Sequence, residues 1–135
     1  MITVDQYFGA KPHSDEQRAA ALHLLGKVNS MMDEAEATGV VFSIDPDTGT
    51  QISGSKGGAG DGGFRLPEAT TGSPKSAHKR AMAVDVYDPG GKFDAWINDD
   101  MLECYDLYRE HPDSTPGWCH LQTRCPLSGR RTFTP

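Results

Sequence analysis

The sequence has little cysteine, no long apolar run and no excess of positive charge. Its three cysteines cannot all pair within the chain, so we expect the reduced thiols of a cytosolic product. The N-terminus lacks the basic and apolar regions of a signal peptide, and no apolar stretch approaches the roughly 20 residues that a membrane span requires. We therefore expect synthesis in the cytoplasm and no membrane span. If the protein acts outside the cytoplasm, we expect something other than a signal peptide to carry it there.

The charge balance argues against nucleic acid as the main partner. The net charge is −6, whereas a protein that binds a phosphate backbone usually carries a basic surface. With 135 residues, the chain suits one domain over residues 1–135 that buries a core without disulfides. Its 15 glycines and 9 prolines predict a large share of loop, and residues 1–13 are expected to form an irregular arm.

A helix is expected to begin after Ser14 and to end at Gly39. The Ser14 hydroxyl can cap free backbone N–H groups, and Gln17 occupies the partner position of a capping box. Glycine is the usual residue immediately beyond a helix C-terminus. Apolar residues recur at steps of three and four, which predicts a buried stripe. The stripe consists of Leu22, Leu25, Val28, Met32 and Ala35, with Met31 beside it.

The region after this helix is expected to contain two short strands and a loop. Residues 40–44 read as a strand, residues 45–49 as a turn, and residues 51–53 as a short return strand. The glycine-rich residues 54–63 lack the Gly-Lys-Ser/Thr ending of a phosphate-binding loop, and no helix pattern follows them. We interpret them as a loop at the rim of a site.

The second half of the chain shows another strand and another helix. Residues 81–87 predict a buried strand that carries Asp85, a charge that is costly there unless it is paired or bound to metal. Asp94 is expected to cap the second helix, and residues 106–115 to form a polar loop. A last edge strand is expected within residues 128–135.

Residues 118–122 alternate as a strand does, so successive side chains lie on opposite faces. Cys119 and Leu121 should therefore lie on one face, and Trp118, His120 and Gln122 on the other. This pattern places His120 on the side of a site and directs Cys119 away from it.

Three side chains form a candidate metal set: His78, Asp85 and His120. Two imidazoles and one carboxylate are a ligand set that catalytic zinc sites use, with a fourth position left for water. The simpler alternative is a buried, hydrogen-bonded pair of His78 and Asp85, with His120 elsewhere. Arg65 has two interpretations as well, a solvated surface arginine or a clamp for a substrate carboxylate.

The spacing of these residues resembles the zinc D-alanyl-D-alanine carboxypeptidase family, which includes phage endolysins that cut peptidoglycan peptides. The resemblance covers residues of about 40 to 122. Three motifs carry it. The first is an arginine after a loop, Arg65, and the second is Ser-x-His-x6-Asp, formed by Ser76, His78 and Asp85. The third is a late Trp-x-His, formed by Trp118 and His120. The residues around these positions are most similar to those of small phage-encoded members of the family.

The resemblance implies a fold, a reaction and a role for each matching residue. It implies an α+β fold, with helices packed on an antiparallel sheet that presents zinc in a cleft, and a peptidoglycan stem peptide as substrate. The three candidate ligands match the zinc ligands of the family. Arg65 matches the arginine that binds substrate and polarises the scissile carbonyl, and Ser76 matches a serine that contacts substrate. Trp118 is expected to contact substrate as well.

Two positions depart from the family pattern. Ala81 stands where the family usually has glycine, which is harmful only if the backbone angle φ is positive there. Gly117 stands where the family usually carries the acidic general base, three residues before the last histidine. We expect Glu110 to take this catalytic role from the 106–115 segment. Asp113 is the other nearby acid, although a turn or cap is its more usual role.

Three hypotheses for function follow. The first is a zinc peptidase that acts on the cell wall in phage lysis or entry. The second is a catalytically inactive relative that binds zinc and serves as a structural or binding component of a virion, which the glycine at position 117 favours. The third is a zinc-stabilised domain unconnected with cell walls, which would need neither Arg65 nor Ser76.

Overall fold

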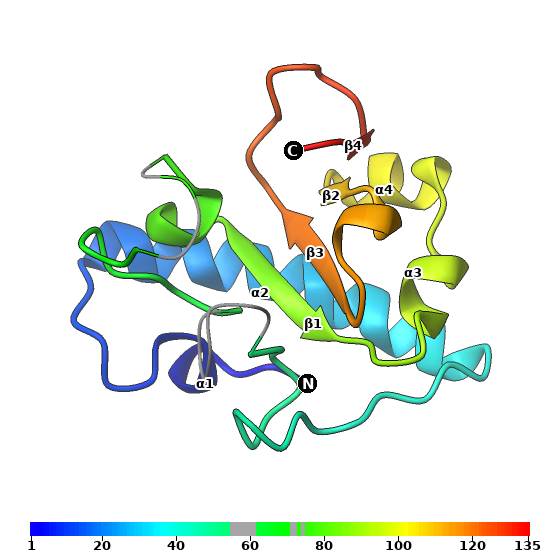
Figure 1. Cartoon of the computed structure of the whole chain (residues 1–135), viewed down its shortest axis with the longest axis horizontal. Coiled ribbons are helices and arrows are strands. Elements are labelled where there is room, and N and C mark those ends of the chain that lie inside the picture. Colours follow the sequence, from blue (N-terminus) through cyan, green and yellow to red (C-terminus); the bar gives the residue numbers. More distant parts are fainter. Residues whose placement is uncertain (55–61, 71–72, 74) are drawn as a thin grey trace.

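The computed structural model describes residues 1–54, 62–70, 73 and 75–135. In this part of the chain the protein is α+β, with helices packed against a small four-stranded sheet (Figure 1). The α+β class that was predicted, with helices on a small sheet, is therefore confirmed. The predicted glycine-rich loop falls mainly on residues 55–61, which lie outside the described residues. No helix in the described part is long and apolar enough to cross a membrane.

The helices begin earlier in the chain than the sequence pattern indicated. Residues 1–13 are not wholly irregular, because Thr3 caps a short helix and forms a reciprocal capping box with Gln6. Tyr7 and Phe8 of this helix are buried. The helices are α1 (Val4–Phe8), α2 (Asp15–Ala37), α3 (Lys92–Trp96) and α4 (Asp99–Tyr105), with short 3-10 helices η1 (Ala77–Arg80) and η2 (Pro112–Ser114).

Helix α2 begins as predicted but buries a different set of residues. Ser14 and Gln17 form the predicted capping box, and Gly39 follows the helix with a positive φ of 103°. Leu22 was wrongly assigned to the stripe, since it is 56% exposed, whereas Leu24 is fully buried. The buried residues of α2 are Ala21, Leu24, Leu25, Val28, Met31, Met32 and Ala35.

The sheet is mixed, not antiparallel as predicted. Its order is β1 (Ala83–Tyr87), β3 (Trp118–Gln122), β2 (Tyr108–Glu110) and β4 (Thr132–Phe133). β3 is antiparallel to both β1 and β2, whereas β4 is parallel to β2. The reason is that β3 already occupies one edge of β2, so the chain crosses to the other edge and runs back in the direction opposite to β3, which is the direction of β2.

The predicted strand over residues 40–44 is wrong. These residues pair with no strand among the described residues, and Val41 is 84% exposed. In the described part of the return segment, one bridge joins the sheet, between Ile52 and Val86. Backbone bonds from Ser53 to the carbonyl of Asp85, and from Asp85 to the carbonyl of Gly62, cover this edge of β1. The apolar run at 40–44 therefore finds no sheet edge to join.

Two further predictions in the second half of the chain are also wrong. Asp94 caps no second helix, because α4 is capped by Asn98, and the Asp94 carboxylate lies 3.4 Å from the guanidinium of Arg109. The polar segment 106–115 is not a plain loop, since it contains β2. The predicted strand over residues 118–122 and a C-terminal edge strand are both confirmed.

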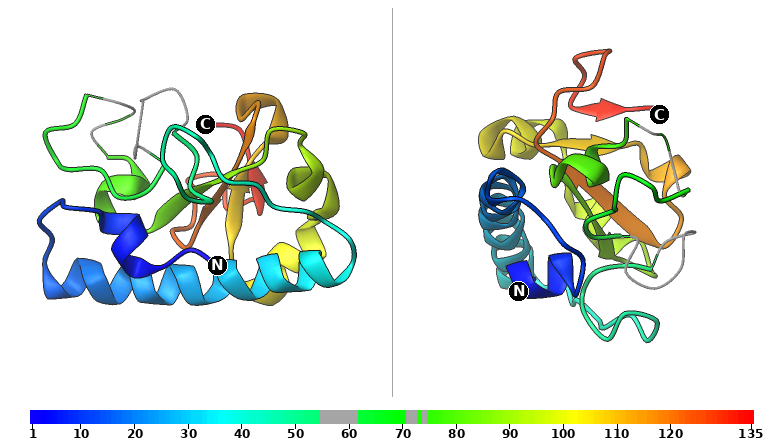
Figure 2. Two further views of the ribbon diagram at one scale, coloured as in Figure 1. Left: turned by 90° about the horizontal axis from the view of Figure 1, so that it is seen from below. Right: turned by 90° about the vertical axis from the view of Figure 1, so that its left-hand side faces the viewer.

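Alternation along the strands separates the core from the site. Helix α2 runs along one face of the sheet (Figure 2), where Val84, Val86, Cys119 and Leu121 join the hydrophobic core. Asp85, which alternates with Val84 and Val86, therefore faces the other side. One layer of helix and one face of sheet form the core, and the opposite face of the sheet is left for polar side chains.

Ala81 adopts the left-handed backbone conformation, with φ 57° and ψ 33°. A Cβ there costs roughly 1–2 kcal/mol. Ala81→Gly removes that strain but loses a buried methyl group and adds chain entropy, which together cost about 1–2 kcal/mol. We expect the free energy of unfolding to change by less than about 1 kcal/mol in urea titrations.

The matched variant Ala83→Gly, in the extended backbone of β1, should lose about 1–2 kcal/mol. Equal losses in both variants would contradict strain at Ala81.

Candidate metal centre

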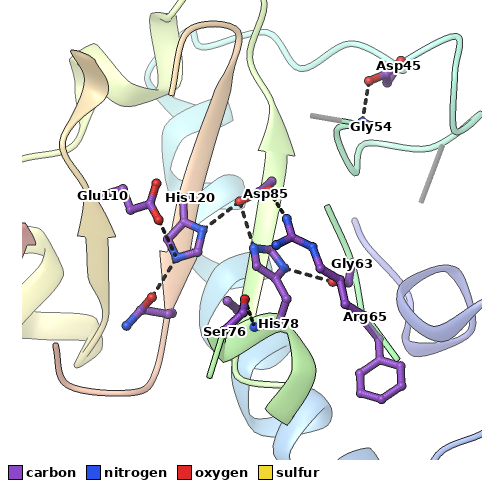
Figure 3. Close-up of polar contacts among 12 residues, drawn as sticks. Asp45, Gly54, Gly63, Arg65, Ser76, His78, Asp85, Glu110 and His120 are labelled. Carbon is purple, nitrogen blue, oxygen red and sulfur yellow. Dashed lines mark hydrogen bonds and ion pairs between the residues drawn. The ribbon is translucent and has the colours of Figure 1, made fainter. Parts of the chain in front are cut away.

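Two neighbouring strands and one short helix bring the three predicted ligands together. Asp85 of β1 and His120 of β3 are directly opposite each other in the antiparallel register, so their side chains lie side by side on the same face. His78 comes from η1, which precedes β1, and the Ser76 hydroxyl accepts a hydrogen bond from the His78 backbone N–H. Figure 3 shows the three side chains pointing toward one another.

Their ligand atoms lie within 4.8 Å of one another, and all three residues are buried. Asp85 Oδ1 is 2.8 Å from His120 Nδ1 and 3.4 Å from His78 Nε2. The second separation is close to the roughly 3.3 Å expected between two ligands of a tetrahedral zinc ion. The first is a hydrogen-bond distance. The group is therefore an assembled His-Asp-His cluster that could hold a metal ion, and the simpler pair of His78 and Asp85 is wrong, because His120 joins it.

The hydrogen bonds behind the two imidazoles fit a metal ion. His78 Nδ1 lies 2.9 Å from the carbonyl of Gly63, which can only accept, so this nitrogen carries the hydrogen and Nε2 keeps its lone pair toward Asp85. His120 Nε2 lies 2.7 Å from Gln122 Oε1, which leaves Nδ1 facing Asp85. One carboxylate oxygen and two ring nitrogens thus meet at one point. Partners of this kind orient metal-binding histidines.

Burial and mutual charge set the protonation of the cluster. Burial lowers the pKa of His78, which favours the neutral imidazole that metals bind. Burial would raise the pKa of Asp85, but its interactions with the two imidazoles of His78 and His120 outweigh burial and hold this pKa well below its usual range. For His120, burial is outweighed by its hydrogen bond to Asp85, so its pKa is raised. A metal ion here would replace a proton that His120 shares with Asp85.

The cluster opens on a cleft of about 670 Å³. The described side chains that line it come from the segment before β1, from β1, β2 and β3, and from the C-terminal segment. The ionisable residues in this lining are Arg65, Lys75, His78, Asp85, Glu110, His120 and Arg124. Trp118, Leu127 and Phe133 contribute apolar surface. A short peptide is of a suitable size for such a cleft.

Arg65 lies beside the cluster and is not a solvated surface arginine. It is only 8% exposed, and its Nη2 lies 3.6 Å from Asp85 Oδ2. Its backbone N–H donates to the carbonyl of His78, which ties the arginine to the same short helix as the first ligand. The guanidinium therefore reaches the cleft from the side opposite Glu110 (Figure 3).

Glu110 is the last residue of β2 and lies on the cleft wall, on a strand and not on a flexible loop as predicted. Its Oε1 is 3.9 Å from His120 Nε2. The side chain of Asp113 is 93% exposed and pairs with His111 at 3.6 Å, away from the cleft lining. Gly117 has a φ of 97°, a conformation that favours glycine, so a side chain at that position would be strained.

The cysteines lie outside the metal cluster. Cys119 is buried on the core face of β3, as the alternation predicted, and Cys104 and Cys125 are exposed. Burial and the charge of Asp94 raise the pKa of the Cys119 thiol well above its usual value. A thiol must lose its proton to bind zinc, so this environment disfavours Cys119 as a ligand.

Sequence reasoning missed several residues of this site. Gly63, Lys75, Arg124 and Phe133 come from segments that no motif connects with the ligands. Gln122 is different, because strand alternation correctly placed it on the same face as His120. Its contact with the His120 ring, however, depends on side-chain rotamers that periodicity does not predict.

Comparisons of the chain with models of protein families, with curated proteins and with solved structures found no match.

Proposed function

We propose that the protein is a zinc-dependent peptidase that cleaves peptidoglycan stem peptides, as a D-alanyl-D-alanine carboxypeptidase or an endolysin-type enzyme encoded by a phage. The observation that carries this proposal is the buried His-Asp-His cluster at the base of a cleft, with a guanidinium on one side and a carboxylate on the other. Three protein ligands are typical of catalytic zinc, whereas structural zinc usually has four. On this proposal the protein acts on the cell wall or is carried in the virion.

Each residue has a task in hydrolysis. His78, Asp85 and His120 would hold zinc, which supplies Lewis acidity at the scissile carbonyl. The Arg65 guanidinium would bind the substrate beside the ligands and stabilise negative charge on the carbonyl oxygen. A Glu110 carboxylate oxygen would accept a proton from the attacking water and return it to the amine nitrogen as the C–N bond breaks.

The charges of the cleft support an anionic peptide as substrate. The whole chain carries a net charge of −6, yet Arg65, Lys75 and Arg124 all line the cleft. Arg124 Nη1 donates to the Lys75 carbonyl at 2.7 Å, which holds this arginine at the cleft wall. A peptide with free carboxylates would find cations here, while Trp118 and Phe133 offer contact for its apolar groups.

The second candidate is a catalytically inactive zinc-binding relative that serves as a component of a virion. The observation that favours it is Gly117, whose backbone conformation disfavours any side chain at the position where the resembled family carries its base. This candidate keeps the metal cluster and predicts no turnover.

The test is hydrolysis by the zinc-loaded protein. We expect release of D-alanine from a D-Ala-D-Ala peptide, or of new amino groups from purified peptidoglycan, measured by amine labelling and mass spectrometry. A chelator should remove the activity and added zinc should restore it. Stoichiometric zinc without hydrolysis of either substrate would contradict the peptidase and favour the inactive relative.

A further inference from the structure

Gln122 has both ends of its amide engaged on the site face of β3. The residue is only 5% exposed and stands two positions after His120 on the same strand face. Its Nε2 donates to the carbonyl of Arg124 at 2.7 Å, and its Oε1 lies 2.7 Å from His120 Nε2. Gln122 is therefore a buried link between the backbone and a candidate ligand.

The donors and acceptors leave one consistent orientation. The Arg124 carbonyl can only accept, so the NH2 group of the amide faces it and Oε1 faces the imidazole. His120 Nε2 must then carry a hydrogen, and Nδ1 faces Asp85 and the candidate metal position. We infer that Gln122 is a positioning residue that fixes His120 as an Nδ1 ligand, an inference that rests on the proposed zinc site.

Glu110 is not the partner that performs this task. Its Oε1 is 3.9 Å from His120 Nε2, beyond hydrogen-bond length, and the side chain is 23% exposed in the cleft. The hydrogen bond of His120 Nε2 goes to Gln122 and not to Glu110. The Glu110 carboxylate can therefore act on a substrate in the cleft. The two residues should have separable effects, with Gln122 setting metal affinity and Glu110 setting turnover.

The experiment compares zinc affinity in three variants, by competition with a chromophoric chelator. Gln122→Met keeps the length of the side chain but loses the amide, and we expect zinc to bind 10–100-fold more weakly, the usual cost of losing such a partner. Gln122→Glu keeps an oxygen toward His120 but loses the hydrogen bond to the Arg124 carbonyl, so its zinc affinity should lie between those of Gln122→Met and the wild type. Gln51→Met, the same exchange outside the cleft lining, should leave affinity unchanged.

A second measurement reads the ring directly. In the zinc-loaded wild type, the 15N shifts of the His120 ring should show coordination through Nδ1 and a hydrogen on Nε2, and Gln122→Met should lose this preference. Coordination through Nε2 in the wild type, or zinc affinity of Gln122→Met within about twofold of wild type, would overturn the role of Gln122. A wild type that binds no zinc would overturn the metal site itself and the inference with it, whereas zinc binding without hydrolysis would contradict only the peptidase.

Discussion

A His120→Ala variant is expected to lose stoichiometric zinc binding at micromolar concentrations and, with it, all hydrolysis. The change removes one of three ligands in a group whose ligand atoms lie within 4.8 Å of one another. It also leaves the ionised Asp85 without its 2.8 Å partner in a buried site. Loss of a ligand should exceed the 10–100-fold weakening typical of losing a partner behind a ligand. Zinc per chain, measured by elemental analysis after gel filtration, checks the result.

The matched control is Cys119→Ser, on the next residue of the same strand. Cys119 faces the core, and its environment keeps the thiol protonated, so zinc content should be unchanged even if stability falls. Thermal unfolding of both variants without metal separates loss of folding from loss of a ligand. Equal zinc content in His120→Ala and wild type would contradict the cluster. Loss of zinc in a folded Cys119→Ser would contradict the conclusion that Cys119 is not a ligand.

A Glu110→Gln variant is expected to keep its fold and its zinc while hydrolysis falls by roughly 10²–10⁴-fold, the usual worth of general acid–base catalysis. Glutamine has the same shape but no basic carboxylate. Glu110 lines the cleft from the end of β2, whereas the backbone at Gly117 disfavours a side chain at the more usual position. Steady-state rates on a D-Ala-D-Ala peptide or on purified peptidoglycan, with zinc affinity measured in parallel, test the assignment.

Asp113→Asn is the matched control, because it makes the same chemical change at the other nearby acid. The Asp113 side chain is 93% exposed and its partner is His111, so the rate should stay within about twofold of wild type. A large loss in Asp113→Asn with none in Glu110→Gln would move the base to Asp113. If zinc affinity fell in Glu110→Gln as much as turnover did, Glu110 would instead be a partner of His120.

The sequence by itself determined the features that depend on local chemistry. The capping box of Ser14 and Gln17 lies within one helical turn, and the alternation of residues 118–122 follows from strand geometry, so both were predicted and both are confirmed. The same alternation placed Cys119 and His120 on opposite faces. The candidate metal cluster could be named from residue types and spacing, because zinc requires particular ligands whatever the fold around them.

Only the tertiary structure decided which patterns found partners. Residues 40–44 have the composition of a strand but no sheet edge to join, while the polar residues of β2 form a strand because β3 and β4 lie on either side of them. The pairing of Asp85 with His120, and the contacts of the two histidines with Gly63 and Gln122, join segments through packing and rotamers. Such contacts depend on how the whole chain packs, and the local periodicity of the sequence carries no information about that packing.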